Sequence, residues 1–199
     1  MSGTIAIAVI FFVIGVVVSF LLLGLANGPS SENLVDEYHA ALTSAREIPA
    51  PAAGSDLETE SLKRWKVLLA DLASESIGDN VKEVYSGNLY FNDTLKTIRT
   101  AEDLAAHFEA TAEILDTGTV KYLSEMRDAS GDLYIRWEMS YSGKKINDGK
   151  PIVTIGMSQL RFDEAGKVVF HQDFWDSTAG IFEHLPVVGG PIKFFRNRM

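Results

Sequence analysis

The chain of 199 residues is long enough for one domain of ordinary size and an appended segment, and 46% of its residues are hydrophobic. Its formal net charge of −9, without a basic stripe interleaved with aromatic residues, argues against a nucleic-acid partner. The absence of cysteine excludes disulfides, thiol nucleophiles and cysteine-ligated zinc.

The N-terminal segment, residues 1–28, is predicted to be a membrane anchor. The run from Ile5 to Leu25 has no charged residue and would measure about 31 Å as a helix, enough to cross a hydrocarbon core. A cleaved signal peptide is the alternative. However, the apolar run is longer than the apolar region of a signal peptide, and no Lys or Arg precedes it. We therefore expect a single-pass protein of the cell membrane. Neither flank is basic, so the folded domain is placed outside the cytoplasm only by elimination.

Residues 29–56 have the composition of a linker. They are rich in Ser, Ala, Pro and Glu and end in Ile48-Pro-Ala-Pro-Ala-Ala-Gly54. Within them, Leu34, Tyr38 and Leu42 recur every four residues and predict a short amphipathic helix.

The predicted domain, residues 57–180, begins with helices. Ser55-x-x-Glu58 has the form of a capping box, and an apolar stripe continues from it toward Gly78. Thr100-x-x-Asp103 starts another helix that ends near Gly118, and His107 is expected to face solvent on it.

The second half of the domain changes to alternating polarity, which predicts strands. The segments are Thr119 to Arg127, Leu133 to Ser142, Pro151 to Phe162 and Lys167 to Ser177. Short, turn-rich connections predict an antiparallel meander. Helices followed by consecutive strands predict an α+β fold, with the helices on one face of a curved sheet.

Ionisable residues within these strands are candidates for chemistry. His171 and Asp173 project from one face of the last strand, and Arg136 and Glu138 share a face of the second. If these faces coincide, two carboxylates flank one guanidinium, and burial raises a carboxylate's pKa toward values useful for acid–base catalysis. The alternative is an ion-pair ladder on an exposed face.

Asp93 follows the apolar strand that ends at Asn92 and either faces a cavity or closes a turn. His171-x-Asp173 is too weak a pattern for a metal site, and phosphate-loop and nucleophile-elbow motifs are absent. The sequence therefore predicts neither a metal nor a cofactor.

Several motifs together resemble the nuclear transport factor 2-like superfamily, most closely its SnoaL-like bacterial branch. They are Tyr90-Phe-Asn-Asp93, the strand with Trp137, Gly149-Lys-Pro-Ile152, Gly166-Lys-Val-Val-Phe-His-Gln-Asp-Phe-Trp-Asp176 and Glu183-His-Leu-Pro-Val-Val-Gly189. The resemblance implies a cone-shaped domain in which a curved antiparallel sheet and three helices enclose a pocket, often as a homodimer. It also implies that Tyr90, Trp137, His171, Trp175 and Asp176 line that pocket.

Roles for the ionisable residues follow from the same resemblance. Asp93 matches the base of isomerase-like members, while Arg136-x-Glu138 and Asp173 are similar to the water-orienting groups of epoxide-hydrolase-like members, except that Glu138 replaces Asp. Two functions stay open: an accessory protein that binds a hydrophobic small molecule or lipid, and a cofactor-independent acid–base enzyme with Asp93 or Asp173 as base.

The tail, residues 181–199, is apolar with interspersed cations. It is expected either to sit at a membrane interface or to close the pocket or a dimer face.

Overall fold

The computed structural model describes residues 31–143, 146–185 and 187–199. Two compact units divide the chain, Met1–Ala40 and Ala41–Met199, and the second contains the α+β domain. The predicted anchor, Ile5 to Leu25, lies outside the described residues. Among the helices that are described, none has the length and apolar character needed to cross a membrane.

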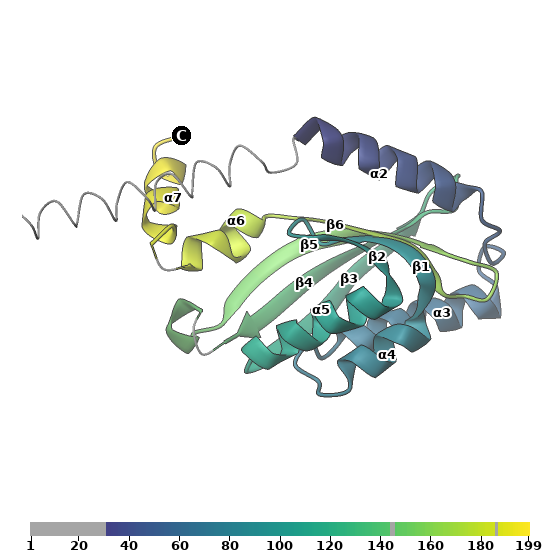
Figure 1. Ribbon diagram of the computed structural model, residues 1–199, viewed down its shortest axis with the longest axis horizontal. Helices are drawn as coiled ribbons and strands as arrows, with labels where there is room; N and C mark the ends of the chain where they lie inside the picture. Colours follow the sequence, from purple (N-terminus) through teal and green to yellow (C-terminus); the bar gives the residue numbers. More distant parts are fainter. Residues whose placement is uncertain (1–30, 144–145, 186) are drawn as a thin grey trace, which may run out of the picture. The chain divides into compact units, whose positions relative to one another are not determined.

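Three helices, α3 (Asp56–Leu69), α4 (Ile77–Val84) and α5 (Ala101–Ile114), cover one face of the sheet (Figure 1). The capping predictions are confirmed. Ser55 Oγ accepts from the Glu58 amide at 3.2 Å, and Thr100 Oγ1 accepts from the Asp103 amide at 3.1 Å. The helix predicted within the linker is also present, as α2 (Ser31–Arg46).

The first domain helix is shorter than predicted. It ends at Leu69 instead of continuing toward Gly78, which lies in the first turn of α4. Leu72 donates its amide to the Gly118 carbonyl at 2.8 Å, and the Asp71 carboxylate accepts from the Ala73 amide at 3.1 Å. The amides of Leu72 and Ala73 therefore bond β3 and a turn side chain instead of helix carbonyls, so the helix does not continue.

Six strands form one curved sheet in the order β2-β1-β6-β5-β4-β3 (Figure 1). Their bounds are β1 Tyr85–Asn92, β2 Thr97–Thr100, β3 Thr117–Arg127, β4 Leu133–Ser142, β5 Ile152–Phe162 and β6 Val168–Trp175. The antiparallel meander of β3 to β6 is confirmed. The expectation of a wholly antiparallel sheet is wrong, because β1 runs parallel to β6. Gly118 belongs to β3 and does not terminate α5.

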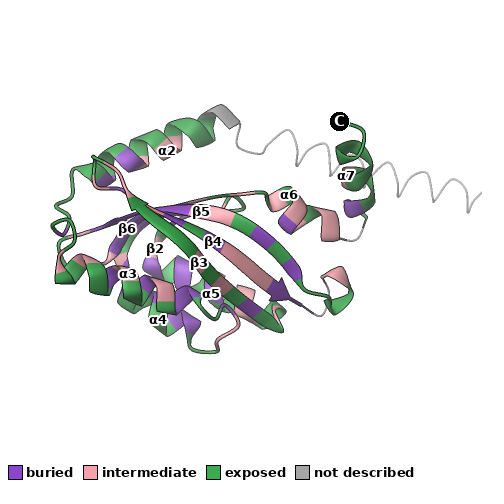
Figure 2. Cartoon of the chain, turned by 180° about the vertical axis from the view of Figure 1, so that it is seen from behind, coloured by how far each residue is buried: buried purple, intermediate pink, exposed green. Residues whose placement is uncertain are grey.

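The hydrophobic core fills the space between the inner face of the sheet and α3, α4 and α5. Fully buried members come from each layer, including Trp65, Val81, Leu104, Ile135 and Leu160. The edge strand β3 is mostly exposed (Figure 2). The inner face of β4, β5 and β6 is therefore the part of the sheet that can shelter a site.

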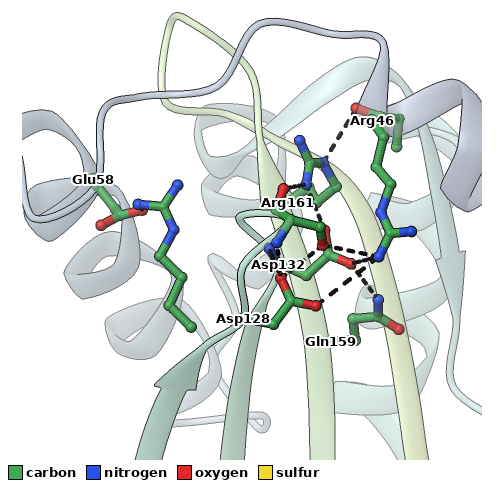
Figure 3. A network of polar contacts seen from close by, with 9 residues as sticks. Arg46, Glu58, Asp128, Asp132, Gln159 and Arg161 are labelled. Atoms are coloured by element: carbon green, nitrogen blue, oxygen red, sulfur yellow. Dashed lines mark hydrogen bonds and ion pairs between the residues drawn. The ribbon is translucent and has the colours of Figure 1, made fainter.

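A network of charged groups lies beside the β3–β4 turn (Figure 3). Asp132, which is 0% exposed, accepts from Arg161 Nη1 at 2.5 Å through Oδ1. Its Oδ2 accepts from Arg46 Nη2 at 2.7 Å and from Gln159 Nε2 at 2.8 Å. Arg161 Nε also donates to the Ala45 carbonyl. One buried carboxylate thus joins the C-terminal end of α2 to β5.

The tail contains short helices. After η1 (Asn147–Gly149) in the β4–β5 loop, the chain ends with α6 (Ser177–Gly180), η2 (Phe182–His184) and α7 (Gly189–Arg196). Tyr141 donates its hydroxyl to the Gly180 carbonyl, which fixes α6 beside the end of β4.

Candidate functional site

A cavity of about 340 Å³ lies between the inner face of the sheet and the helices. Its wall consists mostly of leucine, isoleucine, phenylalanine and tryptophan side chains. The ionisable or hydroxyl-bearing residues that line it are Asp93, His107, Thr111, Tyr141, Ser158, His171 and Asp173. A cavity of this size, largely apolar with a few convergent polar groups, is the usual form of a small-molecule site.

His171 and Asp173 both point into the cavity, because alternate side chains of β6 lie on the same face of the sheet. His171 is 1% exposed, and its Nε2 lies 2.8 Å from Asp173 Oδ1. The same carboxylate oxygen accepts from Ser158 Oγ at 2.5 Å, since Ser158 of β5 is the cross-strand partner of Asp173. Ser158 in turn accepts from the Trp137 indole at 2.9 Å. Both bonds to Asp173 use Oδ1, and no donor among the described residues bonds Oδ2.

The other side of the imidazole is also held. His171 Nδ1 lies 2.7 Å from the Tyr85 hydroxyl, which accepts from the Trp65 indole at 3.1 Å. Burial raises the pKa of Tyr85 well above its ordinary value, the bond from Trp65 opposes this, and the charge of Asp173 adds to it. Tyr85 therefore stays protonated and can donate to Nδ1. With Nδ1 as the acceptor, the Nε2–H of His171 donates to Asp173 Oδ1.

Asp93 has a second histidine as partner. Its Oδ2 lies 2.9 Å from His107 Nε2, and its Oδ1 accepts from the Leu95 and Lys96 amides. Burial acts to raise the pKa of Asp93, but the bond with His107 and the two backbone bonds outweigh it, so the pKa lies below its ordinary value. Asp93 thus closes a turn and also lines the cavity, which combines the two predicted alternatives. A lowered pKa makes it a weak base.

We expect Asp93→Asn to destabilise the fold more at pH 7 than near pH 3. The folded-state pKa of Asp93 lies below the unfolded value of about 3.9, so its contribution is complete above the unfolded value and is lost as pH falls through the folded one. Urea unfolding of both proteins at the two pH values measures the difference. Glu164→Gln, at an exposed position, serves as the control. Equal destabilisation at both pH values would contradict the assignment.

The structure brings together four of the predicted site residues in addition to Asp93. His171, Asp173, Trp137 and Trp175 all line the cavity. Trp175 donates its indole N–H to the Asp93 carbonyl at 2.8 Å, which ties the end of β6 to the β1–β2 turn.

Arg136 and Glu138 do not meet Asp173. In the β4–β5 register they pair with Met157 and Ile155, and their side chains therefore lie on the outer face of the sheet. The predicted guanidinium flanked by two carboxylates is wrong, because Asp173 aligns with Ser158 and hence with Ile135, which is one residue from Arg136. A shift of one residue places a side chain on the opposite face.

Tyr90 and Asp176 also lie outside the cavity, contrary to prediction. Tyr90 is on the outer face of β1, where its hydroxyl donates to Gln172 Oε1 at 2.9 Å and its ring stacks on Phe170. Asp176 accepts from the Ala179 amide at 3.0 Å and caps α6 at the surface. Both are structural in this fold.

Four lining or supporting residues were missed. Ser158 and Tyr85 reach His171 and Asp173 only through strand pairing, and Trp65 of α3 reaches the site through its bond to the Tyr85 hydroxyl. His107 was expected in solvent, yet it lines the cavity. A signal for His107 existed, because it lies three residues after the buried Leu104 and therefore on the same helix face.

A second hollow, of about 640 Å³, lies between α3 and β3. Its charged residues pair with one another, as in Lys66 with Glu125 and Arg127 with Glu58. Among the described residues no group of three carboxylate or imidazole side chains is arranged to hold a metal ion. The cavity that contains His171 and Asp173 is therefore the candidate site.

Comparisons with known proteins identify the fold. No protein-family model matches the sequence, and no curated protein matches it. An NTF2-like protein of unknown function from Exiguobacterium sp. 255-15 is 16% identical, with a TM-score of 0.51 over 58% of this chain and 98% of that one. A protein assigned as a SnoaL-like polyketide cyclase from Jannaschia sp. CCS1 is 12% identical, with a TM-score of 0.54 over 65% and 94%.

An LEH-like epoxide hydrolase of M. tuberculosis is likewise 12% identical, with a TM-score of 0.52 over 73% of this chain and 96% of that one. At these identities the similarity shows the fold alone, which is the NTF2-like α+β fold, as the sequence motifs implied.

Proposed function

We propose that this chain, whose fold is that of the NTF2-like proteins, binds an apolar or lipid-like small molecule that carries one hydrogen-bond donor. The observation that carries this proposal is the Oδ2 of Asp173, which no donor among the described residues bonds, in a largely apolar cavity. An apolar ligand body would gain free energy from leaving water, while its donor would bond the carboxylate. Ligands without a donor would leave that carboxylate desolvated and unpaired.

We also propose that the protein belongs to the SnoaL-like branch and acts as a single-pass membrane protein, anchored by Ile5 to Leu25 with its domain outside the cytoplasm. The length and apolar character of that run support the anchor. Tethering would place the cavity next to a reservoir of poorly soluble molecules, which agrees with its apolar wall. Mass spectrometry of the full-length protein extracted from membranes should identify the retained ligand.

Gly156→Ala should reduce the amount of ligand that is retained. A Cβ on Gly156 would overlap the Trp137 ring and crowd the Cβ of Trp175, so the Trp137 indole must move, and both tryptophans line the cavity. Overpacking of this kind costs about 1–3 kcal/mol and reshapes the site. The measurement is the ratio of ligand to protein in the extracted material.

Gly87→Ala is the matched control, since a Cβ there meets no atom within 4 Å. Retention should be unchanged in Gly87→Ala. If Gly156→Ala keeps the full amount of ligand while its fold is intact by near-ultraviolet circular dichroism, the ligand does not occupy this cavity.

A second function, a cofactor-independent acid–base enzyme, is favoured by the hydrogen-bonded chain Tyr85–His171–Asp173. In this scheme Asp173 Oδ2 takes a proton from the substrate or from a bound water, and the imidazole of His171 stabilises the carboxylate before the transfer. Asp173 is the better candidate for the base, because both carboxylate oxygens of Asp93 already accept bonds within the protein. Chemical conversion of the identified ligand, as opposed to its unchanged release, distinguishes enzyme from binding protein.

A further inference from the structure

Helix α7 presents its aromatic side chains away from the domain. Gly189 is buried, and Arg196 on the same helix face binds Glu183 Oε1 at 2.7 Å. At about 100° per residue, Phe194 and Phe195 lie on the other side of the helix. Phe195 is 67% exposed, and α7 is mostly exposed in Figure 2. A surface helix normally turns its apolar residues to the core, whereas α7 keeps only Ile192 half-buried and leaves both phenylalanines exposed.

The turn that leads into α7 adds to the same apolar surface. Val187 and Val188 are both exposed, and Val187 has a φ of 72°. The left-handed region is unfavourable for a β-branched residue, so this conformation holds an apolar side chain in water at a cost. Ile181, which precedes the turn, lines the cavity, so the tail serves two different environments.

Positive charge accompanies this apolar surface. Residues 189–199 contain Lys193, Arg196 and Arg198 and no acidic residue. Arg196 pairs with Asp176 and Glu183, so the charges assigned to the surface are those of Lys193 and Arg198. The guanidinium of Arg198 lies 3.9 Å from the centre of the Phe194 ring. Aromatic residues among cations are typical of helices that lie in the interface of an anionic bilayer. A contact between two copies of the segment would place like charges against each other.

We infer that α7, with Val187 and Val188, is a docking surface for an anionic lipid bilayer. Phe194 and Phe195 enter the boundary between headgroups and acyl chains, while Lys193 and Arg198 meet the lipid phosphates and carboxylates. This contact is separate from the predicted anchor and from the ligand cavity, and it would orient the domain on the membrane surface.

The test uses the full-length chain with a single fluorescent label. Because the chain has no cysteine, Met199→Cys gives a unique attachment point for an environment-sensitive dye next to α7. With vesicles of phosphatidylcholine containing one third phosphatidylserine, we expect a blue shift and quenching by spin-labelled lipid. Phe194→Ser with Phe195→Ser should reduce the lipid-embedded fraction at least about tenfold, and removing the charge of Lys193 about fivefold.

Val67→Cys on α3 is the matched control. Val67 has the same exposed fraction as Phe195, 67%, but lies on a different element. A label there should stay in water in all vesicles. If the Met199 label also stays in water while the protein is bound to the vesicles, the inference fails although an anchor remains. A blue shift that depends on protein concentration without vesicles would assign the surface to a second copy and overturn the inference.

Discussion

Asp132→Ala is expected to lower the free energy of unfolding by about 3–5 kcal/mol, because it removes the carboxylate that neutralises two arginines at a fully buried position. Arg161 is itself buried and would keep only carbonyl partners (Figure 3). Urea unfolding measures the loss. Hydrogen exchange at residues 41–46 should also become faster, since Arg46 at the end of α2 would lose its bond to Asp132 and keep Ser130 and the more distant Asp128 as partners.

Glu125→Gln is the control for burial. Lys66 Nζ lies 2.5 Å from Glu125 Oε2, the same separation as in the Arg161–Asp132 pair, but the Glu125 side chain is 52% exposed. Exposed pairs contribute about 0–1 kcal/mol, so this substitution should cost little. Asp132→Leu combined with Arg161→Met should recover much of the loss, because an apolar pair leaves no buried charge. Equal costs for Asp132→Ala and Glu125→Gln would contradict the assigned role of burial.

Asp173→Asn should have the largest effect on function while preserving the shape of the cavity. If the site binds a ligand donor, loss of the charge-assisted bond weakens binding by roughly 10- to 100-fold, measured by titration of the ligand identified from membranes. If Asp173 is a general base, turnover of that molecule should fall by about 10²- to 10⁴-fold. Comparing affinity with rate separates these outcomes.

Glu138→Gln is the control for Asp173→Asn. It removes a carboxylate from β4 on the outer face of the sheet, away from the cavity. It should change neither binding nor turnover. Asp93→Asn is expected to act mainly on stability, since the Asp93 carboxylate is occupied by His107 and the turn amides. Unchanged affinity and rate in Asp173→Asn would exclude Asp173 from the site's chemistry.

The helices and strands could largely be predicted because their signals are local. The caps at Ser55 and Thr100 depend on bonds that span three residues. The alternation along β6 placed His171 and Asp173 on one face, which the structure confirms, since both line the cavity. Patterns of this kind are written into consecutive residues and need no knowledge of the fold.

The polar groups that meet in the site are set by how the strands pair. Ser158 reaches Asp173 through the β5–β6 register, and Tyr85 reaches His171 across 86 residues because β1 runs parallel to β6. The register of β4 also turned Arg136 outward. Register is set by pairing and packing across the whole sheet, and a shift of one residue reverses a face. The fold class and the shared face of His171 and Asp173 therefore follow from patterns along the chain, whereas the partners around that face depend on the folded sheet.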